Sequence, residues 1–73
     1  MNNVDVYNTI FINGKPFKCI NTMSLKDLLI YLGFNIDLIV VEYNKKVISS
    51  IVFNQIFLNH HDCLEVITIA GGG

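Results

Sequence analysis

The chain has 73 residues, of which 52% are hydrophobic and 15% are charged. This length allows one small domain with one core, so a two-domain enzyme is excluded. Five lysines, no arginine and six acidic residues give a net charge of −1. A basic surface that would neutralise nucleic-acid phosphates is therefore not expected.

The longest clear apolar run, Leu38 to Val41, is far shorter than the ~20 residues that cross a bilayer. The first five residues are too polar for a signal peptide. We therefore expect a protein that is not exported and has neither membrane nor nucleic acid as a partner. Frequent Asn and Ile are typical of an AT-rich genome. The expected location is the cytoplasm, or the plastid stroma if the gene is organelle-encoded.

A β-hairpin is predicted at the start of the chain. Residues 7–12 are β-branched and aromatic, and they lead into Asn13-Gly14, a pair that accepts positive φ at both central positions of a tight turn. The second arm covers residues 17–20, with Phe17 and Cys19 on one face. Pro16 stands at its start, where a missing N–H is tolerated.

One amphipathic helix follows the hairpin. Ser24 is a favourable N-cap, and Asp27 places a carboxylate in the first turn. Leucines then recur with helical spacing from Leu25 to Leu32. Gly33 stands where a left-handed residue would end the helix.

The second half of the chain predicts further strands. Residues 38–41 are typical of a central strand buried on both faces, residues 42–46 form a polar turn, and residues 47–48 form a short edge strand. After Ser50 we expect a short helical turn and then an extended piece. A polar turn at residues 59–62 precedes the last strand, residues 63–69, in which Leu64 and Val66 alternate against Glu65 and Ile67.

The order β-β-α-β-β-β predicts an α+β fold, a ubiquitin-like β-grasp. It has a mixed four- to five-stranded sheet with one main helix packed on one face, and the last strand lies between the first hairpin and the middle strands. Residues 1–70 are expected to form a single domain and residues 71–73 a glycine tail. Several strands are apolar on both sides, which indicates either a docking face or simply a stabilising surplus of apolar surface.

The chain ends in Gly71, Gly72 and Gly73, and the α-carboxylate of Gly73 is the last group. A tail without side chains fits through a channel too narrow for a Cβ atom. A carboxylate is inert until its oxygen becomes part of a leaving group, so attack on the α-phosphate of ATP would prepare it for a sulfur or amine nucleophile. The alternative is a terminus without a function.

The sequence offers two further groups of residues that could carry chemistry, a pair of histidines and two cysteines. His60 and His61 stand beside Asp62 and Cys63, but adjacent histidines on a turn are expected to point to different sides, and a solvated turn is favoured over a metal site. The two cysteines, Cys19 and Cys63, are expected to be buried or half-buried free thiols. Because no catalytic constellation can be assembled, we expect no catalysis by the chain itself.

The motifs together resemble a known family. They are Ile-Asn-Gly-Lys at 12–15, the helix start at 24–29, the segment Val-Val-Glu-Tyr-Asn-Lys-Lys-Val-Ile at 40–48, and Leu-Glu-Val-Ile at 64–67 running into the terminal glycines. In this order they resemble the ThiS family, the small ubiquitin-like sulfur carriers of thiamine biosynthesis, from residue 10 to residue 73.

The resemblance implies that an E1-like (ThiF-type) enzyme adenylates Gly73 with ATP. A thiocarboxylate then forms with sulfur taken from cysteine through a desulfurase, and it donates that sulfur to thiazole synthase (ThiG-type). Gly71 and Gly72, which have no side chains, would allow the tail to enter the narrow active-site channel of a partner enzyme. No cofactor is bound by the chain itself, since ATP belongs to the adenylating partner, and the chain is a co-substrate and no enzyme.

Alternatives with the same chemistry are the small subunit of molybdopterin synthase and a tRNA-thiolation carrier. A ubiquitin-like binding module is the alternative from another class, and it predicts that deletion of Gly72 and Gly73 leaves function intact. Two features depart from the family. Residues 1–8 extend beyond its usual start, as a tail or a longer first strand, and residues 49–59 lack its usual charges.

Overall fold

The computed structural model describes residues 6–69 of the chain. Strands β1 (Tyr7–Ile12) and β2 (Lys15–Ile20) form an antiparallel hairpin in the register Tyr7 to Ile20. The turn between them has φ of 52° at Asn13 and 82° at Gly14. Both positions are left-handed, as the Asn-Gly pair predicts.

Helix α1 (Leu25–Tyr31) begins and ends where the sequence predicts. The Ser24 hydroxyl accepts a hydrogen bond from the Asp27 backbone N–H at 3.1 Å. Gly33 follows the helix with φ of 90°, and a Cβ atom added there would meet nothing within 4 Å. The need for glycine at this position is therefore conformational and not steric.

The remaining elements are η1 (Ile36–Leu38), β3 (Ile39–Tyr43), β4 (Lys46–Ile48), η2 (Ser50–Gln55) and β5 (Cys63–Thr68). The helical turn after Ser50 confirms the prediction for that segment. The predicted strand at 38–41 and turn at 42–46 are wrong in their bounds. Leu38 belongs to η1 and is 42% exposed. Strand β3 continues to Tyr43 because Glu42 and Tyr43 pair with both neighbouring strands, which leaves only Asn44 and Lys45 in the turn.

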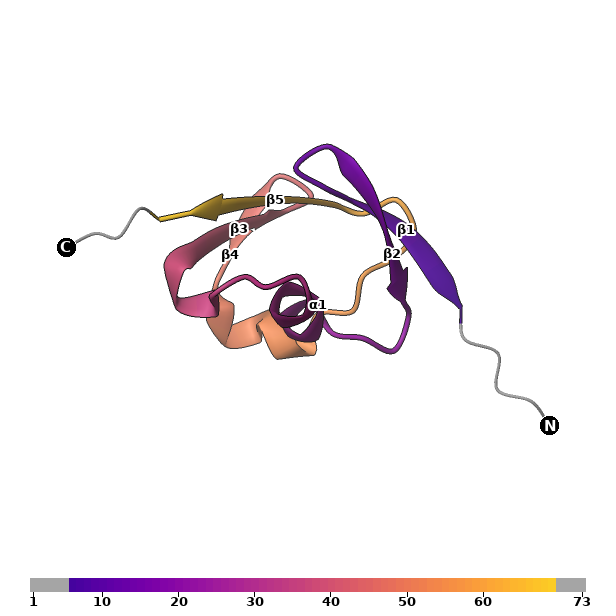
Figure 1. The fold of residues 1–73 in the computed structure, drawn as a ribbon, viewed down its shortest axis with the longest axis horizontal. Coiled ribbons are helices and arrows are strands. Elements are labelled where there is room, and N and C mark those ends of the chain that lie inside the picture. The colour runs from indigo at the N-terminus through magenta and orange to yellow at the C-terminus, as the bar shows by residue number, and fades with distance from the viewer. Residues whose placement is uncertain (1–5, 70–73) are drawn as a thin grey trace.

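The five strands form one mixed sheet in the order β2-β1-β5-β3-β4. Strand β5 runs parallel to β1 and antiparallel to β3, so the last strand lies between the two hairpins as predicted. Figure 1 shows α1 and η2 on the same side of the sheet. The architecture is a ubiquitin-like β-grasp. The strand predicted at residues 38–41 corresponds to β3, which is an interior strand because it pairs with β5 on one side and with β4 on the other.

The core lies between the sheet and the helical layer. It is built from alternate residues of the strands together with three leucines of α1 and Phe53 of η2. Its members are Ile10, Ile12, Cys19, Leu25, Leu28, Leu29, Ile39, Val41, Phe53, Leu58, Leu64 and Val66.

The other sheet surface, which we call the open face, carries the side chains that alternate away from α1. On β1, β3, β4 and β5 they include Phe11, Val40, Glu42, Val47, Cys63, Glu65 and Ile67, and on the first hairpin the pair Thr9 and Lys18. Val40 is only half-buried because no described element covers this face, so the expectation of a strand buried on both faces is also wrong. Among residues 6–69, no helix is both long and apolar enough to cross a lipid bilayer.

Candidate functional site

Strand β5 leads directly to the predicted site. The residues predicted to carry the chemistry, Gly71, Gly72 and Gly73, lie outside the described residues. The Ile69 backbone N–H donates to the Leu38 carbonyl at 2.7 Å. The chain therefore stays hydrogen-bonded to the fold, at the residue that precedes β3, up to the last residue that the structure describes.

The Asn13 side chain holds the middle of β5. Its Nδ2 donates to the Val66 carbonyl at 3.2 Å, and its Oδ1 accepts from the Val66 N–H at 2.8 Å. The Asn13 backbone N–H also donates to the Leu64 carbonyl at 2.9 Å. Strand β1 ends at Ile12, so the amide of Asn13 takes the place of a further strand residue and continues the pairing with β5. This contact crosses 53 positions of sequence.

A cluster of polar contacts holds the start of β5. The Asp62 carboxylate accepts from the Tyr43 hydroxyl at 2.6 Å, from the Asn59 backbone N–H at 2.8 Å and from Asn44 Nδ2 at 3.1 Å. The Asn44 Oδ1 accepts from the Cys63 backbone N–H at 2.8 Å. The turn between β3 and β4 is thereby joined to the turn that precedes β5.

The pKa values of two groups in this cluster, Asp62 and Tyr43, are shifted in opposite directions. Partial burial by itself would raise the pKa of the Asp62 carboxyl, but the hydrogen bonds from Tyr43, Asn59 and Asn44 outweigh burial and hold that pKa below its usual value. Burial, the hydrogen bond to Asp62 and the nearby negative charge raise the pKa of the Tyr43 hydroxyl to about 12. At neutral pH the pair is therefore an ionised carboxylate with a neutral phenol as its donor.

The two histidines do not point to different sides, and that expectation is wrong. Their ring centroids are 3.8 Å apart with the planes tilted by 30°. The His60 Nδ1 accepts from the Thr9 N–H at 2.9 Å, and the His61 N–H donates to the Thr9 carbonyl at 2.6 Å. Both backbone groups of Thr9 are thereby satisfied, so the histidines extend the pairing between β1 and β5. Among residues 6–69, no three metal-ligating side chains come together.

The two thiols are free but differ in exposure. Cys19 is buried in the core, and burial raises the pKa of its thiol. Cys63 is exposed at the start of β5, so the expectation that it is buried or half-buried is wrong. Its position in the alternation of β5 places it on the open face, opposite Phe11.

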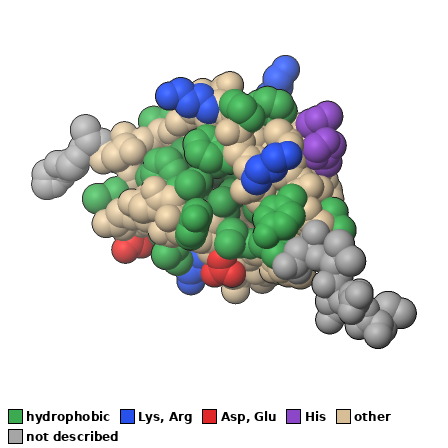
Figure 2. All heavy atoms as spheres, turned by 45° about the vertical axis from the view of Figure 1, so that its right-hand side comes forward, with side chains coloured by type: hydrophobic (Ala, Val, Ile, Leu, Met, Phe, Trp, Pro, Cys, Tyr) green, Lys and Arg blue, Asp and Glu red, His purple; other side chains and the backbone are tan. Residues whose placement is uncertain are grey.

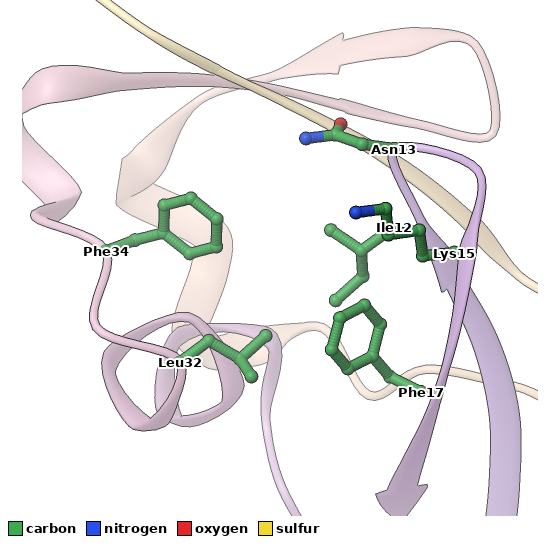
Figure 3. Close-up of a pocket in the computed structure, with 6 residues that line it drawn as sticks. All are labelled: Ile12, Asn13, Lys15, Phe17, Leu32 and Phe34. Carbon is green, nitrogen blue, oxygen red and sulfur yellow. The ribbon is translucent and has the colours of Figure 1, made fainter.

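An apolar hollow of about 290 Å³ lies between the β1–β2 hairpin and the end of α1. Figure 3 shows Phe34 and Phe17 on opposite sides of it, with Leu32 between them and Asn13 at its upper rim. The only titratable side chain in the lining is Lys15. Figure 2 shows one face of the molecule, on which hydrophobic side chains gather in the middle and the two histidines lie at the margin.

The described residues thus form the two sheet surfaces and hold β5 firmly in its place. The sequence correctly singled out β5 and the alternation of Leu64 and Val66 with Glu65 and Ile67. It missed the clamp by Asn13 and the cluster around Asp62. The Asn-Gly pair signals a turn, but no local pattern reveals that the same asparagine contacts a strand 53 positions away.

A fold of this kind, with a mixed sheet whose middle strand is the last one, defines a small ubiquitin-like protein. Residues 10–73 match the model of the ThiS family, so the chain belongs to this family, whose members are sulfur carriers of thiamine biosynthesis. The chain is also similar to the crystal structure of the thiamine biosynthesis protein ThiS from Geobacter metallireducens. That similarity has a TM-score of 0.70 and 25% identity, and it covers 89% of this chain and 99% of that one.

Relatives of similar length are uncharacterized ycf40 proteins. The protein of Pyropia yezoensis is 48% identical over 65 residues, which cover 89% of this chain and 92% of that one. The protein of Trieres chinensis is 38% identical over 73 residues and is covered in full. A thiazole synthase of Magnetococcus marinus is 36% identical over 64 residues, which make up 88% of this chain and 20% of that protein.

Proposed function

We propose that the chain carries sulfur on the C-terminal carboxylate of Gly73 and delivers it to a thiazole synthase. The observation that carries this proposal is the family match, which extends through the terminal glycines. The geometry supports it, because β5 is held on both sides and leads straight to the tail.

The reaction consists of three displacements at the C-terminal carboxyl group. In an adenylating E1-like (ThiF-type) enzyme, a carboxylate oxygen of Gly73 attacks the α-phosphate of ATP and pyrophosphate leaves. A cysteine desulfurase transfers the sulfur of cysteine as a persulfide, whose terminal sulfur attacks the acyl carbon, so that AMP leaves and an acyl disulfide forms. A thiol then attacks the other sulfur of this disulfide, which releases the thiocarboxylate and leaves a new disulfide. Gly71 and Gly72 have no Cβ atoms, so they pass through a narrow channel. In this scheme the chain is a co-substrate of its partners, and the ATP is bound by the adenylating enzyme.

The proposal of thiazole synthase as the sulfur acceptor is based on the similarity to the Magnetococcus marinus protein. That thiazole synthase contains a region similar to 88% of this chain. A carrier-like region within a thiazole synthase favours the thiamine pathway over the molybdopterin and tRNA-thiolation alternatives. The compartment we propose is the plastid stroma, because three relatives are ycf40 proteins, which plastid genomes encode.

Intact mass spectrometry tests the proposal. The protein is incubated with ATP, the E1-like enzyme of the same organism, a cysteine desulfurase and cysteine. We expect a gain of about 16 Da, which corresponds to the exchange of one oxygen for sulfur. The matched control lacks Gly72 and Gly73 but keeps every described residue, and its mass should not change. An unchanged mass of the full chain, with an enzyme shown to be active on another carrier, would refute the proposal.

A further inference from the structure

The open face combines apolar and acidic side chains in one small area. Val47 is 69% exposed and Ile67 is 54% exposed. Val40 lies directly opposite Ile67 on the neighbouring strand. Figure 1 shows that α1 and η2 lie on the other side of the sheet, so no described element covers these side chains. Exposed apolar groups gathered in this way are typical of a surface that is covered by a partner.

Two carboxylates lie within this apolar area. Glu42 of β3 and Glu65 of β5 are directly opposite each other in the antiparallel register, and Val47 of β4 lies on the other side of Glu42. Like charges at directly opposite positions weaken a strand pair. The fold itself gains nothing from this arrangement, whereas a cation brought by a partner would gain two carboxylates at once.

The open face is also continuous with the tail. Ile67 is followed within β5 by Thr68, and Ile69 is still bonded to Leu38. Gly73 is four residues beyond Ile69 in the sequence. Four residues at ~3.3 Å each span at most about 13 Å, whatever their conformation. Any enzyme that holds the end of the tail therefore lies close to this end of β5.

We propose that the Glu42–Glu65 pair, with the apolar side chains around it, is the contact surface for a lysine or arginine set among apolar side chains on thiazole synthase. The inference rests on the proposed function, because it takes the acceptor enzyme as the partner. The paired carboxylates set the orientation of the carrier, and the surrounding apolar area supplies burial. Charge complementarity of this kind contributes to specificity and to the rate of association.

The experiment measures binding of the carrier to the purified thiazole synthase of the same organism by isothermal titration calorimetry. The variants are Glu42→Gln, Glu65→Gln and the double substitution. The matched control is Asp27→Asn, which removes one charge from the exposed surface of α1, in the layer on the opposite side of the sheet. The double variant should bind at least about tenfold more weakly, and the salt dependence of binding should fall. Asp27→Asn should bind like the wild type.

A stability measurement separates docking from folding. Because the two carboxylates repel each other, the melting temperature of the free double variant should be unchanged or higher. A second pair of variants tests the apolar part of the surface. Ile67→Thr keeps the β-branched shape and should weaken binding to thiazole synthase. Its control, Ile51→Thr, alters an exposed residue of η2 in the helical layer and should leave binding unchanged.

The outcomes distinguish the two proposals. If the wild type binds the enzyme and the double glutamine variant binds equally well, the docking inference is wrong while the carrier function stands. If binding of the double variant falls only in parallel with its stability, the docking inference is also wrong. If the wild type shows no binding to thiazole synthase under conditions in which it gains the sulfur, both the acceptor and the docking surface are refuted.

Discussion

The two faces of the sheet differ in what their side chains do. On the face toward α1, alternate residues such as Ile10, Val41 and Leu64 are completely buried. On the open face, neighbouring positions of the same strands expose Val47 and Ile67 beside two opposed carboxylates. One face of the sheet therefore packs in the core, whereas the other exposes apolar side chains and two like charges that do not stabilise the fold. Stability and recognition should consequently respond to different substitutions.

The largest effect is expected in the core. Leu29→Ala removes a fully buried side chain from α1, and it should lower the free energy of unfolding by about 2–5 kcal/mol. Urea denaturation followed by circular dichroism measures this change. Ile67→Thr on the open face should change stability by only about 0.5 kcal/mol. Equal losses in the free energy of unfolding for the two variants would show that the open face contributes to stability as much as the core face does.

The clamp on β5 should contribute an intermediate amount. Asn13→Gly keeps the positive φ that the turn needs but removes both side-chain hydrogen bonds to Val66. A loss of roughly 1–3 kcal/mol is expected because two backbone groups of β5 lose their partners. Native-state hydrogen exchange should show faster exchange of the Val66 amide while the amides of α1 exchange at rates that follow global stability. An unchanged Val66 amide would show that the clamp is dispensable.

A smaller loss than at Leu29 or Asn13 is expected at Asp62, and it depends on pH. The pKa of its carboxyl is lowered in the folded state, so its contribution is complete above the unfolded value of about 4 and decreases as the pH falls through the lower folded value. Asp62→Asn should cost about 1–2 kcal/mol at pH 7. The difference from the wild type should shrink progressively below about pH 4. Parallel stability curves for the two proteins from pH 7 to pH 2 would contradict this account.

Local signals in the sequence predicted the local features of the fold. Ser24 and Gly33 bound the helix, and Asn13-Gly14 forms the first turn, because each of these residues satisfies a backbone requirement of its own neighbourhood. Alternation in residues 63–69 also predicted which side of β5 is buried. Periodicity of this kind is a property of short segments and survives without tertiary information.

Features that depend on distant segments escaped prediction. The extension of β3 to Tyr43 depends on pairing with β5, and the place of Cys63 on the uncovered face depends on which strand lies beside it. The stacking of His60 on His61 follows from the hydrogen bonds of both residues with Thr9, about fifty positions earlier in the chain. Sequence spacing contains no information on such contacts. The assignment of the site to Gly71, Gly72 and Gly73 rests on their position in the sequence and stays a prediction.

The central place of β5 has a mechanical consequence. A force that pulls on the C-terminal end of β5 acts along this strand. Most of the hydrogen bonds between β5 and its two neighbours lie across that direction. These hydrogen bonds then bear the force together, in shear. In a strand pulled away sideways from a sheet edge, they would break one after another. If the proposed function holds, this arrangement lets the protein keep its fold while partner enzymes bind and release its C-terminal end.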